Sequence, residues 1–149
     1  IHRGMGTTVV TAFIDDGTAY VANVGDSRAY AVRDDEIVQI TTDHSVVSEL
    51  VMRGTITKEE ARLHPQKNII TRAVGTDKSV RTDIFEYNYS PGDVMIICSD
   101  GLSTMLDDNR ILEIIKSKKT SEDTVNSLIA AAKDEGGLDN ITVICIRFI

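Results

Sequence analysis

One strand that ends in an acidic turn constrains this chain more than any other stretch. Residues 94–97 are all apolar, which predicts a buried strand, and a small polar pair follows before Asp100 and Gly101. The glycine lets the backbone turn sharply where a side chain would clash. The Asp100 carboxylate would then stand at the end of a rigid strand, where it suits a hard cation such as Mg²⁺ or Mn²⁺. An ordinary turn aspartate is the alternative, because Asp-Gly is a common turn pair.

The first part of the chain is rich in strand-like segments. Alternating and β-branched residues predict strands at residues 7–14, 18–24, 28–32 and 37–40. The pair Asp16-Gly17 between the first two is a strong hairpin signal. The sequence Gly25-Asp26-Ser27 separates the second predicted strand from the third. We interpret residues 1–41 as an antiparallel meander.

The character of the sequence changes after the fourth strand. Residues 46–53 are compatible with a helix. The spacing of Thr57 and Glu60 is that of a capping box, which predicts a second short helix that Pro65 ends. A charged, loop-rich insertion between strand regions often lies at the rim of a site and moves.

The last part of the chain mixes strands and helices. Strands are predicted at residues 80–89 and 94–99. Two amphipathic helices follow, one capped by Asp107 or Asp108 and the other by Thr120 or Ser121. The final segment, residues 141–149, is apolar on both faces, so we interpret it as a central strand covered on both sides. Two helices and many strands in mixed order predict an α+β domain with its helices packed outside the sheets.

Composition limits the class of protein. The 149 residues suffice for one domain with a sizeable core, and 42% are apolar, which indicates a globular chain. The net charge is −7 and no basic block stands out, which argues against a nucleic-acid surface. No apolar run approaches the ~20 residues that a membrane span needs. Cys98 and Cys145 lie in apolar runs, which indicates reduced core thiols in a reducing compartment.

Three acidic residues share one kind of position. Asp26 follows Gly25 at a strand break. Asp100 lies at a strand end, and Asp139 precedes the last strand. Neighbouring antiparallel strands can bring such positions to one edge, where three carboxylates would repel unless a divalent cation lies between them. Three unrelated turn aspartates are the alternative. His44 has no paired metal-ligand spacing and is interpreted as a local hydrogen-bonding residue.

Six short motifs follow one another along the chain. They are Gly4-Met5-Gly6-Thr7-Thr8, Val24-Gly25-Asp26-Ser27-Arg28-Ala29-Tyr30, Thr42-Asp43-His44-Ser45, Asn68-Ile69-Ile70-Thr71-Arg72-Ala73-Val74-Gly75, Cys98-Ser99-Asp100-Gly101-Leu102 and Asp139-Asn140-Ile141-Thr142-Val143. Each motif is weak alone. In this order they make the chain resemble the metal-dependent serine/threonine protein phosphatases of the PP2C family, in its compact bacterial form. The resemblance covers essentially the whole chain.

The resemblance implies a fold. The family has a four-layer α-β-β-α sandwich of mainly antiparallel sheets, with metals at one edge of the two sheets. Residues 1–149 would form the C-terminal portion of a single phosphatase domain of this kind, and residues 43–75 the flap beside its active site. The chain begins without methionine and enters a strand almost at once. We therefore expect a piece of a longer polypeptide, with the first strands and helices of the fold missing.

The resemblance also implies the site. Asp100 and Asp139 correspond to ligands of a binuclear metal centre, and Asp26 to the ligand of a third, weaker metal. His44 and Ser45 would lie on the substrate side of the flap. Oxygen ligands favour two or three Mn²⁺ or Mg²⁺ ions. The family's bridging aspartate, phosphate-clamping arginine and general-acid histidine belong to upstream motifs, so we expect no catalytic residue within this chain and no activity from it alone.

The implied function is metal-dependent hydrolysis of phosphoserine and phosphothreonine in proteins by a water held between two metal ions. Such an enzyme would reverse bacterial serine/threonine kinase signalling in the cytoplasm. Its partners would be phosphorylated proteins and a cognate kinase, and neither nucleic acid nor a membrane. A degenerate phosphatase-like module that binds phosphoproteins, and a fragment left by proteolysis, are the alternatives.

Overall fold

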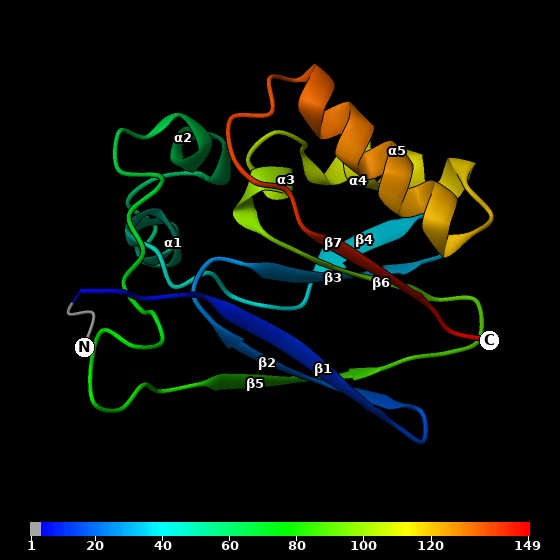
Figure 1. Ribbon diagram of the computed structural model, residues 1–149, viewed down its shortest axis with the longest axis horizontal. Coiled ribbons are helices and arrows are strands. Elements are labelled where there is room, and N and C mark those ends of the chain that lie inside the picture. Colours follow the sequence, from blue (N-terminus) through cyan, green and yellow to red (C-terminus); the bar gives the residue numbers. More distant parts are fainter. Residues whose placement is uncertain (1–3) are drawn as a thin grey trace.

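Two antiparallel β-sheets packed face to face form the body of the protein, with helices over the outer face of one of them (Figure 1). The structure is a computed structural model that describes residues 4–149. Ile1, on which part of the expectation about the start of the chain rests, lies outside the described residues. The predicted α+β sandwich is confirmed. The described residues form three of its layers: helices, a four-stranded sheet and a three-stranded sheet.

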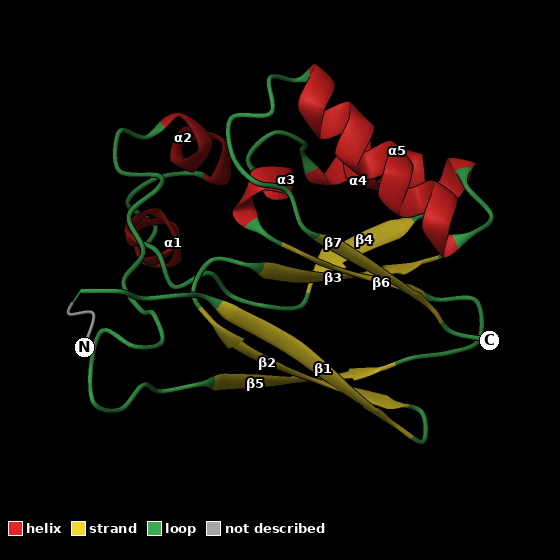
Figure 2. Cartoon of the chain, in the orientation of Figure 1, coloured by secondary structure: helices red, strands yellow, loops and turns green. Residues whose placement is uncertain are grey.

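Strands and helices follow one another in mixed order along residues 4–149 (Figure 2). The strands are β1 (Val9–Asp15), β2 (Thr18–Val24), β3 (Arg28–Arg33), β4 (Glu36–Gln39), β5 (Asp83–Asn88), β6 (Val94–Cys98) and β7 (Val143–Arg147). The helices are α1 (Val46–Met52), α2 (Lys58–Leu63), α3 (Asp100–Ser103), α4 (Asp108–Ser117) and α5 (Ser121–Asp134). None of these helices combines the length and the apolar character that a membrane crossing requires.

The chain changes sheet between β2 and β3. The three-stranded sheet has the order β1-β2-β5 and the four-stranded sheet the order β4-β3-β6-β7, with antiparallel neighbours throughout. The predicted meander over residues 1–41 is therefore wrong, because β1–β2 and β3–β4 are hairpins in different sheets. β2 and β3 therefore stack on each other in different sheets and do not pair side by side in one sheet. Ala19 and Val21 of β2 pack with Ala29 of β3 in the core between the sheets. Stacking buries these apolar side chains, whereas a single flat sheet would leave them exposed on its face.

The four-stranded sheet is packed on both faces. Alternate residues of β6 point to opposite sides, so the whole strand is buried, as its apolar sequence predicts. Val94, Ile96 and Cys98 belong to a helix-side core, which consists of Tyr30, Val32, Val94, Ile96, Cys98, Leu102, Leu106, Ile111, Ile114, Ile115, Leu128 and Ala132. The sheet–sheet core on the other face consists of Ala19, Val21, Ala29, Met95, Ile97 and Phe148.

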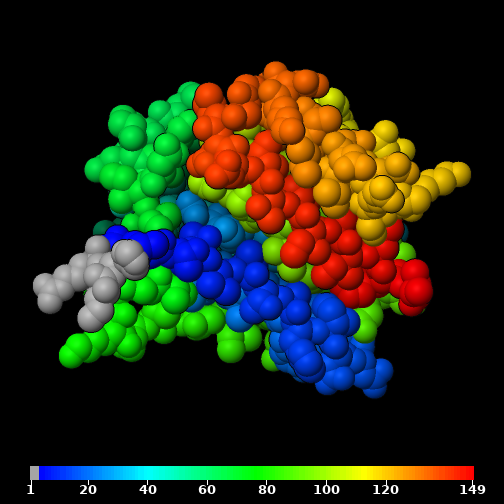
Figure 3. Space-filling view, viewed as in Figure 1, coloured from blue at the N-terminus to red at the C-terminus, as the bar shows by residue number. Residues whose placement is uncertain are grey.

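The last strand does not take the place that its sequence predicts. β7 lies at one edge of the four-stranded sheet, and β1 lies at one edge of the other. Figure 3 shows both edges on the same face of the molecule, β7 in red and β1 in blue. The prediction of a central strand covered on both sides is wrong for the described residues, since Ile144 is 52% exposed. An apolar run indicates that most of its side chains favour burial. It does not indicate how many strands lie next to it in the sheet.

Side-chain caps begin the helices where the sequence predicts them. Asp107 and Thr120 accept hydrogen bonds from backbone N–H groups at the start of α4 and α5. Thr57 and Glu60 form the predicted capping box of α2, with hydrogen bonds of 3.1 and 2.7 Å. The single turn of α3 was not predicted, because four residues are too few to show a helical period.

Candidate metal centre

Strand register brings three acidic turns to one end of the four-stranded sheet. The first residue of β3 pairs with Cys98 at the end of β6, and Cys98 pairs with Val143 at the start of β7. Asp26, Asp100 and Asp139 lie two to four residues beyond these paired positions. The tertiary structure thus gives the three predicted ligands a common edge.

A set of backbone contacts ties the end of β6 to the loop before β7. The Ser99 hydroxyl donates to the Asn140 carbonyl at 3.2 Å and accepts from the Thr142 N–H at 3.0 Å. The Ser99 N–H donates to the Thr142 carbonyl at 3.0 Å. A Cβ atom on Gly101 would lie 2.2 Å from the Asn140 carbonyl oxygen, so glycine is required for this close approach. These contacts hold the acidic turn of β6 against the acidic loop before β7.

The turn that carries Asp26 is also closely packed. Gly25 has a φ of +111°, and a Cβ atom there would lie 2.4 Å from Cγ2 of Thr8. The hydroxyl of the same Thr8 is hydrogen-bonded to that of Ser27 at 2.8 Å. The motif at residues 24–30 therefore needs its glycine for a structural reason: the backbone there is left-handed and packs against Thr8, the residue before β1.

Burial and mutual repulsion act on the carboxylates. Burial, followed by the charge of Asp100, raises the pKa of Asp26 to about 6. Burial, followed by the charge of Asp139, raises the pKa of Asp100. The guanidinium of Arg28 opposes both shifts but does not cancel them. The charge of Asp100 thus acts on Asp26, and the charge of Asp139 acts on Asp100.

This arrangement fits a hard divalent cation as part of a larger set of ligands. Carboxylate oxygens are the donors such ions prefer, and a cation would relieve the repulsion that raises the pKa of Asp26 and Asp100. Within residues 4–149, however, no three histidine, cysteine, aspartate or glutamate side chains lie close enough together to hold a metal ion. The three aspartates would supply only some of the roughly six oxygens that each Mg²⁺-like ion takes.

Arg28 belongs to the site, although from the sequence it was identified only as one member of the motif at residues 24–30, with no role of its own. Its guanidinium pairs with the Asp43 carboxylate, with Nη2 2.7 Å from Oδ2 and Nε 3.0 Å from both oxygens. Its Nη1 donates to the Tyr30 hydroxyl at 2.8 Å. Arg28 stands two positions after Asp26, and its partner lies 15 residues further along the chain. The sequence offered one hint of this role, which is that Arg28 lies close to the predicted ligand Asp26. The ion pair with Asp43 could not be predicted, because no periodic pattern connects residues 15 positions apart.

Residues 43–75 form a separate lobe beside the sheets, where Figure 1 shows α1 and α2. Two isolated bridges close this segment, Ser45 with Ile70 and Thr7 with Val74. The Ser45 hydroxyl caps α1 by accepting from the Ser48 N–H at 3.2 Å. Ser45 is buried, so its side chain is engaged within the chain.

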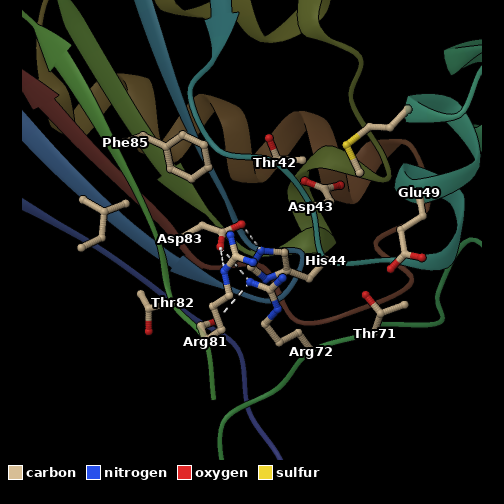
Figure 4. A pocket seen from close by; sticks show the side chains of 12 residues that line it. Thr42, Asp43, His44, Glu49, Thr71, Arg72, Arg81, Thr82, Asp83 and Phe85 are labelled. Carbon is tan, nitrogen blue, oxygen red and sulfur yellow. Dashed lines mark hydrogen bonds and ion pairs between the residues drawn. The ribbon is translucent and has the colours of Figure 1, made fainter. Parts of the chain in front are cut away.

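A cleft of ≈ 470 Å³ separates this lobe from β5 (Figure 4). It is lined by Thr42, Asp43, His44, Glu49, Met52, Thr71, Arg72, Arg81, Thr82, Asp83, Ile84 and Phe85. His44 forms part of the wall but is only 5% exposed, and its ring is hydrogen-bonded to Asp83 at 2.9 Å. His44 is a hydrogen-bonding residue, as predicted, but the partners of its ring lie 19 and 39 residues away in the sequence, so the bonds are not local.

Comparison with known proteins supports the same reading of the motifs. The sequence model of the family "Protein phosphatase 2C" matches residues 2–50. The serine/threonine phosphatase stp of Listeria innocua is 43% identical over 145 residues, which are 97% of this chain and 58% of that protein. The crystal structure of the phosphatase Stp1 from Staphylococcus aureus superposes with a TM-score of 0.95 at 44% identity, over 98% of this chain and 57% of that one.

A third relative carries metal. The catalytic domain of the phosphatase PstP, crystallised in complex with two manganese ions, superposes with a TM-score of 0.86 at 36% identity, over 96% of this chain and 59% of that one. The chain thus spans less than two thirds of the length of the relatives it matches. The family match at residues 2–50, the identity over nearly the whole chain and the shared fold agree: the chain is similar to protein phosphatases of the 2C family along nearly all of its length.

Proposed function

We propose that the protein containing this chain hydrolyses phosphoserine and phosphothreonine in proteins with the help of Mn²⁺ or Mg²⁺. Asp100 and Asp139 are the proposed ligands of two ions, and Asp26 of a third, weaker one. The observation that carries the proposal is the common edge on which these three carboxylates lie, in a chain similar to protein phosphatases of the 2C family. The Listeria and Staphylococcus relatives are named serine/threonine phosphatases, and the PstP structure contains two manganese ions.

The chemistry needs positive charge next to a phosphate ester. Bound divalent ions would lower the pKa of a water and neutralise the phosphoryl oxygens. The residues of this chain would contribute carboxylate oxygens at the place where the divalent ions are needed. The end of β6 supports Asp100, Ser99 holds the loop before β7 beside it, and Arg28 keeps Asp43 paired at the border with residues 43–75.

The setting proposed for this reaction is the bacterial cytoplasm. Phosphorylated proteins would be the substrates and a cognate serine/threonine kinase the source of the phosphate. Cys98 and Cys145 are both free, and Cys98 is buried in the helix-side core, which suits a reducing compartment.

The test replaces one proposed ligand at a time. We expect Asp100→Asn and Asp139→Asn, in the natural protein that contains this chain, to lower the turnover of p-nitrophenyl phosphate by orders of magnitude. Calorimetric titration should show weaker Mn²⁺ binding in both, because each loses a charged oxygen donor. Asp16→Asn is the matched control, since Asp16 lies in the exposed β1–β2 turn, where asparagine before glycine is equally suitable.

Two results would contradict parts of this proposal. Turnover equal to that of the control in both variants would remove the metal assignment. A protein that binds phosphopeptides but shows no Mn²⁺-dependent hydrolysis would support the alternative of a degenerate binding module. For Asp26→Ala we expect retained tight Mn²⁺ binding and slower turnover, with a changed dependence on Mn²⁺ concentration.

Residues 43–75 are proposed as a flap that selects peptide substrates through the cleft beside β5. Met52 lines the cleft and is 65% exposed, so a bound peptide could reach it while p-nitrophenyl phosphate would not. We expect Met52→Ala to raise KM for a phosphopeptide more than KM for the small substrate. Leu63→Ala on α2 is the control, since Leu63 is 87% exposed outside the cleft. Equal changes with both substrates would contradict selection by this segment.

A further inference from the structure

His44 joins three parts of the chain that are far apart in sequence. Its backbone N–H donates to the Gly25 carbonyl at 2.9 Å, and its own carbonyl accepts from the Thr71 N–H at 2.8 Å. Its ring reaches Asp83 at the start of β5, as Figure 4 shows. At 5% exposure it is among the most buried polar residues of the described chain. All four polar groups of this residue are therefore engaged.

The hydrogen bonds of the ring select one protonation form. Nδ1 accepts from the Gly25 N–H at 3.0 Å, so Nδ1 carries no hydrogen. Nε2 lies 2.9 Å from Oδ2 of Asp83, a carboxylate that can only accept while it is ionised. Both contacts are satisfied by the neutral imidazole with its hydrogen on Nε2. The other tautomer and the imidazolium would each place two hydrogens between Nδ1 and the Gly25 nitrogen.

Asp83 is itself held in the ionised form. The hydrogen bond with His44 and the Arg72 guanidinium, whose Nη1 lies 2.9 Å from Oδ1, lower the pKa of Asp83. Nε of Arg81 lies 3.6 Å from the same oxygen. The carboxylate thus provides a lasting acceptor for the Nε2 hydrogen, and orientation of a histidine by such a partner is a common device in functional sites.

The backbone group that His44 holds is the one before Asp26. Gly25 lies in the left-handed region, where glycine has several accessible conformations and little intrinsic preference. His44 engages both the N–H and the carbonyl of Gly25. Asn23 adds a longer bond from Nδ2 to the same carbonyl, at 3.3 Å. Thr8 also packs against Gly25, and its hydroxyl is hydrogen-bonded to that of Ser27. Among the hydrogen bonds of residues 4–149, however, only those of His44 and Asn23 engage the polar backbone groups of Gly25.

We propose that His44 is a positioning residue: its Nε2–H tautomer, oriented by Asp83, sets the Gly25 turn and thereby the direction of the Asp26 carboxylate. The inference deepens the proposed function, on which the role of Asp26 rests. It differs from a purely structural role for a buried histidine, which would affect the stability of the fold and leave cation binding at Asp26 unchanged.

Two matched variants separate the two ring nitrogens. In His44→Asn the amide oxygen takes the place of Nδ1 and can accept from Gly25, but the side chain is too short to reach Asp83. In His44→Gln the amide takes the place of Nε2 and can donate to Asp83, while no acceptor remains for Gly25. Each variant is made in the natural protein that contains this chain, and folding is checked by circular dichroism and thermal unfolding.

The first measurement does not depend on metal or on activity. We expect the amide hydrogen of Gly25 to exchange about tenfold faster in His44→Gln than in His44→Asn, the size expected for one net hydrogen bond. In the unsubstituted protein, ¹⁵N chemical shifts of the imidazole should show hydrogen on Nε2 and none on Nδ1. Hydrogen on Nδ1, or equal exchange in the two variants, would overturn the inference.

The second measurement concerns the cation. Titration with Mn²⁺ alone should show weaker binding at the low-affinity site in His44→Gln, several-fold relative to the unsubstituted protein, with substantial recovery in His44→Asn. Equal loss in both variants, in step with their thermal stability, would mean a structural role only and would overturn the inference. Asp26→Ala distinguishes the two proposals: if it leaves Mn²⁺ binding unchanged, the third cation site fails, while the exchange and tautomer results still decide the role of His44 in the turn.

Discussion

The two sheets of this protein differ in what covers them. In the described residues the four-stranded sheet lies between α4 and α5 on one side and the other sheet on the other, and every residue of β6 is buried. The three-stranded sheet has its core on one face only, and its other face carries Phe13 at 67% and Ile84 at 69% exposure. One sheet is thus a central layer, and the other is an outer layer.

The acidic residues lie at the end of the sheet that is covered on both faces. Asp100 and Asp139 extend from strands of the covered sheet, and Asp26 lies in the connection that leads into it. Carboxylates that repel one another would move apart if the backbone that carries them were flexible, because separation relieves the repulsion. A strand packed on both faces holds them in place, since densely packed interiors deform little.

The largest expected effect contrasts one isoleucine from each sheet. Ile96 is fully buried in the helix-side core, and its replacement by alanine should lower the free energy of unfolding by about 2–5 kcal/mol. Ile84→Ala on the outer face should change it by about 0.5 kcal/mol or less, because the side chain is already in water. Urea unfolding monitored by circular dichroism measures both. Similar losses would show that the outer face is covered in solution.

A smaller effect concerns the link between the sheets at the end away from the acidic turns. Asp93 accepts from Arg33 of the four-stranded sheet at 2.6 Å and from the Tyr87 hydroxyl of the three-stranded sheet at 2.8 Å. The hydrogen bond from Arg33 is the largest cause that lowers the pKa of this buried carboxyl from 3.8 to about 2. A pKa lower in the folded than in the unfolded state stabilises the fold above the unfolded value and ceases to do so as the pH falls through the folded value.

The contribution of Asp93 should therefore be complete, at about 2 kcal/mol, once the pH is well above 4, and it should be lost as the pH falls from about 4 to about 2. Asp93→Asn should lower the free energy of unfolding at neutral pH by this order and flatten its decline over the acidic range. The exposed Asp16→Asn serves as the control. Parallel pH profiles for Asp93→Asn and the unsubstituted protein would contradict the role of this link.

The smallest expected effect compares two phenylalanines of the three-stranded sheet. Phe13 points to the outer face, whereas Phe85 packs against the sheet–sheet core. Phe13→Thr should change the free energy of unfolding by about 0.5 kcal/mol or less, because threonine suits a strand and no core contact is lost. Phe85→Thr should cost clearly more by the same urea measurement. A cost for Phe13→Thr as large as that for Phe85→Thr would mean that the two faces of this sheet are equally buried.

Much of the local structure could be predicted from the sequence. The Asp16-Gly17 hairpin, the capping box at Thr57 and the buried strand at residues 94–97 all follow from signals within a few residues. For the site, the sequence left two possibilities open, three acidic turns at one edge or three unrelated turn aspartates. Register then showed that Asp26, Asp100 and Asp139 share an edge, although the distance between their motifs is large in sequence.

Other features could not be predicted, because they depend on which partner a residue meets. The ion pair of Arg28 with Asp43 and the bond of His44 to Asp83 span 15 and 39 residues, and no periodicity connects such pairs. The exposed Ile144 lies in a sequence that suggested full burial. Hydrophobic pattern indicates that a side chain favours burial, but the number of neighbouring strands is set by the whole sheet.

Short-range signals in the sequence specify most of the elements, their caps and turns, and the residue types that suit a divalent cation, since these depend on backbone preferences and side-chain chemistry over short distances. The change of sheet at Gly25, the covering of one sheet on both faces and the hydrogen bonds of His44 to the turn before Asp26 become visible in the folded chain alone. The physical reason is that stacking of sheets and long-range hydrogen bonds follow from the total apolar surface buried and the total polar groups satisfied. Both totals depend on the whole chain, so they cannot be predicted from any single segment.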